Sequence, residues 1–133
     1  MRAILDPAAL RLAGIPGPER LQRLRDINQE LAHAVTAAEA VRLDDEWHFE
    51  LLGECTNKIL LGYIAQVTWR TRRYELGLMR RPPNVRRSTR EHRKILSALK
   101  AGALEDACHQ LSANMSSGKE PILAWLRERE RGP

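Results

Sequence analysis

The chain has 133 residues, of which 43% are hydrophobic and 29% charged, and its formal net charge at pH 7 is +5. This length suits a single domain with its own hydrophobic core. No apolar run approaches the ~20 residues that a membrane-spanning helix needs, and no signal peptide follows Met1. The two cysteines, Cys55 and Cys108, form no disulfide framework. We therefore expect one cytoplasmic domain over residues 1–133.

Much of the positive charge lies between Arg80 and Lys94, where Glu91 is the only acidic residue. Such a segment could bind phosphate or nucleic acid, but charge runs of this kind are more often a solvated loop and helix start. No aromatic residue lies among these arginines, and the chain has no zinc-finger or helix-turn-helix pattern. DNA binding by this chain alone is therefore not expected.

The first half of the chain is predicted to be helical, because its apolar residues recur at helical spacing and β-branched residues are sparse. A helix over residues 2–13 is followed by a break at residues 14–18, which are rich in glycine and proline. The next predicted helices cover residues 18–35, 36–55 and 58–79. Thr36 and Glu39 form a capping box at the start of the second of these.

The second half begins with the longest predicted break, residues 80–84 around two prolines. Ser88 and Glu91 form another capping box and predict a helix that runs to Lys100 and stops at Gly102. The last helices are predicted over residues 104–115 and 121–130. The fold class is therefore all-α, an antiparallel bundle of six to seven helices.

The centre of the chain is the segment of residues 43–52, where Asp44 and His48 lie one helical turn apart on the same side as Trp47. A carboxylate and an imidazole that face the interior need partners, and a metal ion shared with other helices is a suitable one. His92 adds a second inward imidazole. Two histidines and an aspartate suit zinc, nickel, iron or manganese better than calcium. On spacing alone, however, a polar cluster without metal is the commoner outcome.

Two further groups of residues have predicted roles. Tyr63 and Arg70 lie on one side of the helix predicted over residues 58–79, with Gln66 and Arg73 adjacent. An arginine on a core-facing stripe needs a carboxylate, from the protein or from a ligand; alternatively, Arg70 lies at the bundle end and extends to solvent, or it pairs with Glu50 or Glu54. Two histidines with polar neighbours are read as surface or capping groups: His33 and His109.

Four segments, in this order, resemble the FCD domain, the C-terminal effector-binding domain of the FadR subfamily of GntR transcription regulators. The resemblance extends from Arg2 to about Trp125. Its carriers are Arg-Ala-Ile-Leu-Asp-Pro-Ala-Ala-Leu-Arg-Leu-Ala at residues 2–13, Asp-x-x-Trp-His-x-x-Leu at 44–51, Asn-x-x-Leu at 57–60, and Glu-His-x-x-Ile-x-x-Ala-Leu-x-x-Gly at 91–102.

The resemblance implies that Asp44, His48 and His92 bind a divalent transition metal, zinc or nickel above all. Many members have a further histidine where this chain has Asn114. An amide oxygen is a poorer ligand for these metals than an imidazole. Asn114 could therefore bind weakly, orient another ligand or turn toward the effector. Alternatively, the domain binds its effector without metal, as the acyl-CoA-responsive members do.

The function that the resemblance implies is sensing of a small organic acid by a domain that is not an enzyme. Arg70 is the first choice and Arg73 the second for the effector's counter-charge, with Tyr63 and Gln66 in the pocket wall. The signal would pass through a homodimer to DNA by a winged helix-turn-helix domain, which this chain lacks, so it is either an excised domain or a free-standing sensor.

Two other readings stay open. A metal-dependent hydrolase is possible because a metal with an open position can activate water, but Asp45 and Glu46 are the only candidates for its general base. The second alternative is a purely structural dimerisation bundle, in which Asp44, His48 and His92 form a polar cluster whose hydrogen bonds are satisfied without a metal.

Overall fold

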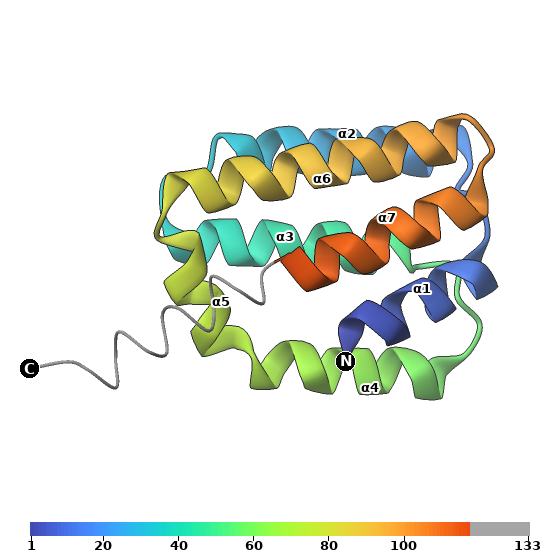
Figure 1. Ribbon diagram of the computed structural model, residues 1–133, viewed down its shortest axis with the longest axis horizontal. Helices are drawn as coiled ribbons and strands as arrows, with labels where there is room; N and C mark the ends of the chain where they lie inside the picture. The colour runs from blue at the N-terminus through green and yellow to red at the C-terminus, as the bar shows by residue number, and fades with distance from the viewer. Residues whose placement is uncertain (118–133) are drawn as a thin grey trace, which may run out of the picture.

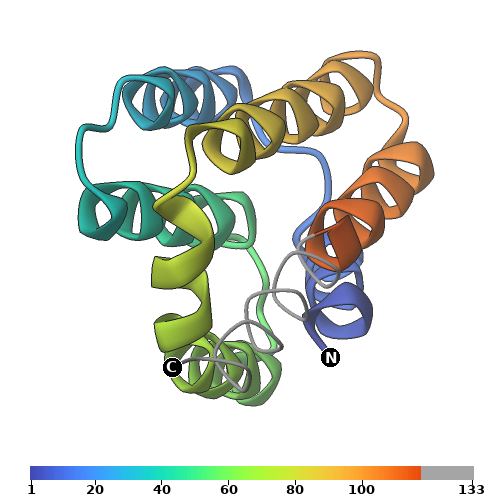
Figure 2. The ribbon, with the colours of Figure 1, turned by 60° about the vertical axis from the view of Figure 1, so that its left-hand side comes forward.

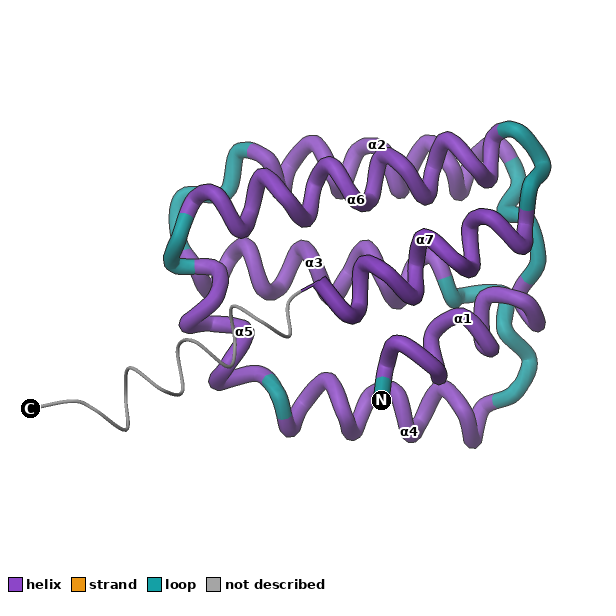
Figure 3. The backbone as a smooth tube through the Cα atoms, in the orientation of Figure 1, coloured by secondary structure: helices purple, strands orange, loops and turns teal. Residues whose placement is uncertain are grey.

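The computed structural model describes residues 1–117, which form seven helices and no strand within that range (Figure 3). The helices are α1 (Arg2–Ala13), α2 (Pro18–Ala32), α3 (Ala37–Leu51), α4 (Lys58–Arg70), α5 (Arg72–Met79), α6 (Pro82–Lys100) and α7 (Leu104–Ser117). The all-α prediction is confirmed. The helix predicted over residues 121–130 lies outside the described residues. Within the described range no helix is long and apolar enough to cross a membrane.

The helices pack around a shared centre (Figures 1 and 2). α2 contacts both α3 and α6, α7 lies between α6 and α1, α4 packs on α1, and α5 packs on α3. Segments far apart in the chain therefore meet: the N-terminal helix α1 lies against α7, and α3 faces the centre together with α6 and α7.

The core consists of two apolar clusters. The larger is built around Trp47, which is fully buried, and includes Leu24, Ile95 and Leu111 from three other helices. The smaller one surrounds Leu43 and joins α2, α3 and α5. Because Trp47 and Leu43 flank Asp44 and His48 on α3, burial of their side chains turns the polar pair inward as well.

Pro7 lies inside α1, where its missing N–H leaves the Ala3 carbonyl without its intrahelical donor. Ser112 of α7 takes that place, since its Oγ donates a hydrogen bond of 2.9 Å to the Ala3 oxygen. The Cys108 thiol lies 3.6 Å from the Pro7 carbonyl oxygen. The proline is therefore tolerated through contacts that attach α7 to α1.

Two predicted helix ends, at Thr36 and Gly102, are confirmed, and Asn57 supplies a further cap. Thr36 Oγ1 accepts a hydrogen bond of 3.1 Å from the Glu39 amide, as its predicted capping role requires. Asn57 caps α4 by accepting from the Leu60 amide at 3.0 Å. Gly102 follows α6 with a φ of 76°, a conformation that favours glycine, and so confirms the predicted stop.

Two element predictions were wrong. The helix predicted over residues 58–79 divides at Thr71, whose hydroxyl lies 3.1 Å from the Val67 carbonyl oxygen and 3.3 Å from that of Thr68. Hydrogen bonds of this kind from a threonine to the preceding turn often bend helices. The loop predicted over residues 80–84 is shorter, because α6 already begins at Pro82, where a proline loses no helical hydrogen bond. Ser88 is thus buried in the middle of α6, and the second capping box does not form.

Candidate metal centre and adjoining pocket

Three potential metal ligands meet at the centre of the bundle. Asp44 and His48 come from α3 and His92 from α6, and one ligand atom of each lies within 4.8 Å of the other two. Both imidazoles are fully buried, whereas the Asp44 side chain is 15% exposed. The structure therefore brings together the three residues that the sequence singled out.

His92 is held in one tautomer. Its Nδ1 lies 2.8 Å from Asn28 Oδ1, and the Asn28 amide nitrogen is occupied as a donor to the Thr89 carbonyl oxygen at 3.1 Å. Because Asn28 Oδ1 can only accept, Nδ1 carries the ring proton and Nε2 keeps its lone pair. The ring also stacks on Trp47, with 3.8 Å between centroids and 6° between planes.

The free nitrogen of His92 points at Asp44. Nε2 lies 3.1 Å from Asp44 Oδ1, outside hydrogen-bond geometry, and among the described residues this buried atom has no hydrogen-bond partner. A buried imidazole with one nitrogen anchored by a neighbour and the other unpaired beside a carboxylate has the form of a metal ligand.

His48 is anchored in the same way at Nδ1, which lies 2.8 Å from the Asp44 backbone carbonyl oxygen. Since a carbonyl oxygen only accepts, Nδ1 donates this bond. The other ring nitrogen, Nε2, lies 2.8 Å from Oδ1 of Asn114 on α7. Asn114 is 7% exposed, so it stands beside the cluster at the place where the sequence put a doubtful fourth ligand.

Charge and burial set the protonation of the cluster. Burial alone would raise the pKa of Asp44, but the adjacent imidazoles of His48 and His92 lower it to about 2. Burial lowers the pKa of His92 to about 4, against the opposing effect of Asp44. Asp44 is therefore ionised and His92 neutral at pH 7, which are the forms that bind a metal.

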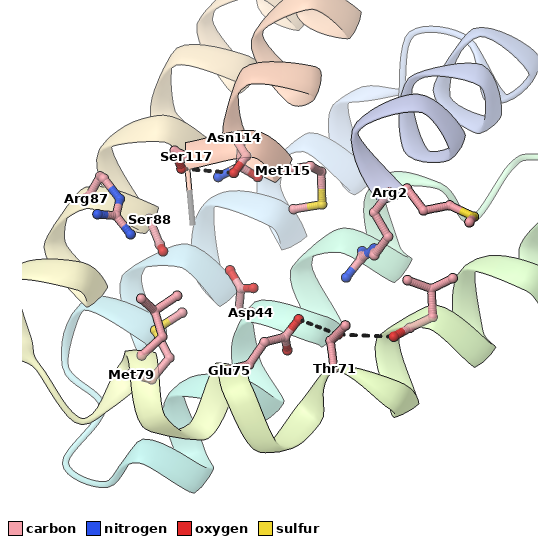
Figure 4. Close-up of a pocket in the computed structure, with 13 residues that line it drawn as sticks. Arg2, Asp44, Thr71, Glu75, Met79, Arg87, Ser88, Asn114, Met115 and Ser117 are labelled. Carbon is pink, nitrogen blue, oxygen red and sulfur yellow. Dashed lines mark hydrogen bonds between the residues drawn. The ribbon is translucent and has the colours of Figure 1, made fainter. Parts of the chain in front are cut away.

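A pocket of about 180 Å³ adjoins the cluster, and Asp44 and Asn114 form part of its wall (Figure 4). Asp44 lies between Arg2 and Arg87, which stand on opposite sides, and Glu75 closes the pocket from below in this view. The lining residues are Met1, Arg2, Asp44, Val67, Thr71, Glu75, Leu78, Met79, Arg87, Ser88, Asn114, Met115 and Ser117.

The pocket carries charges of both signs. Arg2 is 8% exposed and pairs with Asp6, at 2.8 Å between Nη2 and Oδ2. Arg87 differs, because its Nε is buried and has no hydrogen-bond partner among the described residues. Burial, followed by the charges of Asp44 and Asp45, raises the pKa of Glu75 to about 7. The pocket thus offers an arginine whose buried Nε has no partner within residues 1–117, and a carboxyl that exchanges its proton near neutral pH.

The four residues predicted to bind the effector lie elsewhere. Tyr63, Gln66, Arg70 and Arg73 are exposed on α4 and α5, and none of them lines the pocket. The buried side of α4 presents Ile64 and Thr68 instead. The predicted stripe is therefore the solvent side of the helix. The two remaining histidines, His33 and His109, are exposed as predicted.

Four residues of the site had no predicted role: Arg2, Asn28, Glu75 and Arg87. A buried role for Asn28 could have been predicted, since it is a polar residue on the apolar stripe of α2 between Leu24 and Leu31. The sequence signal for Arg2 is weaker: Asp6 follows it at the i+4 spacing of a helical ion pair. Nothing in the local sequence distinguishes Arg87 from the other arginines nearby, or Glu75 from a surface acid.

Comparison with protein families agrees with this architecture. The model of the FCD domain family matches residues 1–117, which is most of the chain. The chain belongs to the FCD domain family. FCD domains are the effector-binding domains of GntR-family transcription regulators, so this chain is an effector-binding domain of that kind. No curated protein and no solved structure was found to match it.

Proposed function

We propose that this domain senses a small carboxylate at a divalent metal held by Asp44, His48 and His92, and thereby controls DNA binding by a separate domain. The observation that carries the proposal is the buried Nε2 of His92, which has no hydrogen-bond partner in the described part of the chain and lies 3.1 Å from an Asp44 carboxylate that also lines a pocket. A bound ion would supply open coordination positions for carboxylate oxygens. Zinc and nickel are the metals expected from the family.

Arg87 is the residue best placed to recognise the effector's charge. A guanidinium group forms paired hydrogen bonds with a carboxylate, and Arg87 is the pocket arginine whose buried Nε is unpaired among the described residues. Arg2, on the opposite side, already pairs with Asp6 and adds positive potential. Arg87 and Arg2 thus replace Arg70 and Arg73 in the proposed site.

The size of the pocket bears on the class of effector. A cavity of 150 Å³ holds benzene, so a pocket of about 180 Å³ suits a ligand of roughly six to eight non-hydrogen atoms. Short dicarboxylates, hydroxy acids and small amino acids have this size. Only part of a long acyl chain would be enclosed, so a metal-free sensor of acyl-type ligands is the less supported alternative.

The composition of the pocket wall supports a route by which an effector could influence DNA binding. Arg2, Asp44, Glu75, Arg87 and Asn114 come from five different helices. An effector that contacts several of them favours one arrangement of these helices over another. In a homodimer, such a change would alter the spacing of two attached DNA-binding domains.

The first experiment is the metal content of freshly purified protein, measured by mass spectrometry with His48→Ala and His92→Ala variants alongside. We expect about one equivalent of a divalent metal in the wild type and a large loss in both variants. A protein that takes up no metal even after loading with zinc, nickel or manganese would overturn the metal-dependent proposal.

The second experiment separates the two candidate sites for the effector's charge. In a thermal-shift screen of short carboxylates with metal present, Arg87→Met should abolish the stabilisation that a hit gives the wild type. Arg70→Met removes the same charge from an exposed position of α4 and serves as the matched control. Loss of the shift in the Arg70 variant alone would place the site on α4.

A metal-dependent hydrolase is the second candidate, and one observation favours it. Glu75 lines the pocket with a pKa of about 7, the range in which a general base works well at neutral pH. Asp45 and Glu46, the bases considered from the sequence, pair with Arg72 and Arg42 and do not line the pocket. Turnover of simple esters or amides that Glu75→Gln abolishes would support this reading.

A further inference from the structure

We infer that Glu91 positions Asn114 as an oxygen ligand of the metal centre, so that the site prefers a six-coordinate, oxygen-binding cation such as Mn²⁺ more than a site with histidine at this position would. This inference rests on the proposed metal binding. It adds that Asn114, which stands where many family members have histidine, is oriented toward the centre by a neighbouring side chain, Glu91.

The orientation of the Asn114 side chain is set from α6. Glu91 Oε1 accepts a hydrogen bond of 2.7 Å from Asn114 Nδ2 and another of 2.8 Å from Ser117 Oγ. A carboxylate only accepts, so it selects the NH₂ side of the carboxamide. Asn114 Oδ1 is thereby turned away from Glu91 and toward His48, where it lies 2.8 Å from Nε2.

This orientation places an amide oxygen beside a ligand nitrogen. His48 Nδ1 is engaged with the Asp44 carbonyl oxygen, so Nε2 is the ring nitrogen that faces the centre, and Asn114 Oδ1 lies 2.8 Å from it. An ion bound to His48 Nε2 would therefore have this amide oxygen within reach. His92 Nε2, which has no hydrogen-bond partner among residues 1–117, would be a further ligand atom of the same ion.

The separations of the ligand atoms indicate the kind of ion. With bonds of about 2.1 Å, adjacent ligands lie about 3.0 Å apart in an octahedral shell and about 3.4 Å apart in a tetrahedral one. The two relevant pairs, His48 Nε2 with Asn114 Oδ1 and His92 Nε2 with Asp44 Oδ1, are 2.8 and 3.1 Å apart. Both separations are closer to the octahedral value, and a set of two oxygen and two nitrogen ligands suits Mn²⁺ or Fe²⁺ better than tetrahedral Zn²⁺.

The test is a titration of the metal-free 133-residue chain with Mn²⁺ and with Zn²⁺, by calorimetry or competition with a chelator. Asn114→Ala should weaken Mn²⁺ binding by about tenfold or more, the size of effect that loss of a supporting group has at metal sites. Asn114→His should raise the preference for Zn²⁺ over Mn²⁺ by about tenfold or more. The electron paramagnetic resonance spectrum of bound Mn²⁺ should change in both variants.

The role of Glu91 is tested by a double-mutant cycle. Glu91→Ala frees the carboxamide to turn and donate to His48 Nε2, so Mn²⁺ affinity should fall nearly as far as in Asn114→Ala. In the Asn114→Ala background, the Glu91 substitution should then have little further effect. Glu46→Ala removes an equal charge from an exposed position two residues before His48 and should leave affinity unchanged.

The outcomes are distinguishable. If His48→Ala and His92→Ala abolish metal binding while Asn114→Ala binds both metals like the wild type, this inference fails and the metal centre stands. If neither histidine variant changes metal binding, the proposed centre itself is overturned. If Glu91→Ala still weakens binding in the Asn114→Ala background, Glu91 acts by its charge and not by positioning. Should Asn114→Ala fail to fold in a thermal melt, the comparison of Asn114→His with the wild type decides.

Discussion

Asn28 holds the site together at the scale of single residues. Its amide group joins the Thr89 carbonyl to His92 Nδ1 and so decides which nitrogen of His92 faces Asp44. Asn28 is 4% exposed, so water does not easily take its place as the hydrogen-bond partner of His92. One buried amide thus couples the packing of α2 on α6 to the chemistry of the centre.

Replacement of Asn28 by leucine should therefore affect both stability and metal binding. The buried N–H of His92 would lose its acceptor, which costs about 1–3 kcal/mol in the free energy of unfolding. Metal affinity should fall by about tenfold or more, because the tautomer is no longer set. Urea unfolding and metal titration measure the two effects. Gln29→Leu, at the adjacent exposed position, is the control; equal losses in both variants would contradict the assignment.

Glu75 gives the pocket a pH dependence whose sign follows from its pKa. The folded pKa of about 7 exceeds the ordinary 4.5, so the stability that this group contributes is full below pH 4.5 and is lost as the pH rises through 7. Glu75→Gln should thus stabilise the metal-free protein at pH 8 by about 2 kcal/mol, a figure reduced for the partial exposure of the group, and change little at pH 4.5.

Denaturant unfolding of both proteins at pH 4.5 and pH 8 measures this difference. His92, whose pKa is lowered to about 4, acts in the opposite sense: its contribution is full above pH 6.5 and is lost as the pH falls through 4. Because His92 is present in both proteins, its effect cancels in the comparison. A difference between variant and wild type that does not change with pH would refute the role given to Glu75.

At the scale of elements, α1 depends on α7 for one of its own hydrogen bonds. Ser112→Ala should lower the free energy of unfolding by about 1 kcal/mol, since the Ala3 carbonyl loses the donor that replaces the missing N–H of Pro7. In a Pro7→Ala background the helix supplies its own donor, so the same serine substitution should cost less. A double-mutant cycle by urea unfolding measures this coupling, and equal costs in both backgrounds would exclude it.

The division of one predicted helix into α4 and α5 matters for the site. α5 packs on α3 and brings Glu75 to the pocket, while α4 packs on α1 and leaves one side exposed. A continuous helix could not make both contacts. The change of direction at Thr71 therefore explains why Arg70 of α4 is absent from a pocket that Glu75 of α5 lines.

At the scale of the whole molecule, α1 and α4 carry several large exposed apolar side chains. Ile4 is 76%, Ile59 76%, Tyr63 58% and Trp69 73% exposed. Because α1 and α4 pack on each other, these residues offer a surface for the homodimer included in the proposed function.

Ile59→Glu should accordingly convert a dimer to a monomer in sedimentation experiments, because it places a charge in the apolar contact. Val35→Glu is the matched control, since Val35 is 90% exposed between α2 and α3, away from that surface. A wild type that is monomeric at high concentration, or a dimer that survives the Ile59 substitution, would refute this interface.

The sequence by itself determined the features that depend on neighbours along the chain. Helical spacing predicted most of the helices, the cap at Thr36, and the common side of Asp44 and His48, because residues three or four apart always lie together on a helix. The apolar spacing of the helix that ends at Lys100 added His92 as an inward imidazole, and the family resemblance gave all three residues the role of metal ligands. The positions of these residues are as predicted in the structure, and their role as ligands stays a prediction.

Only the tertiary structure decided which distant side chains meet. Helical periodicity does not say which side of α4 faces inward, so Arg70 was chosen where Arg87 lines the pocket. Nor does it say that Glu91, taken for a capping residue, lies against Asn114, or that Asn28 lies against His92. Those contacts join residues 23 to 64 positions apart, and they exist because packing of α2, α6 and α7 brings the helices together.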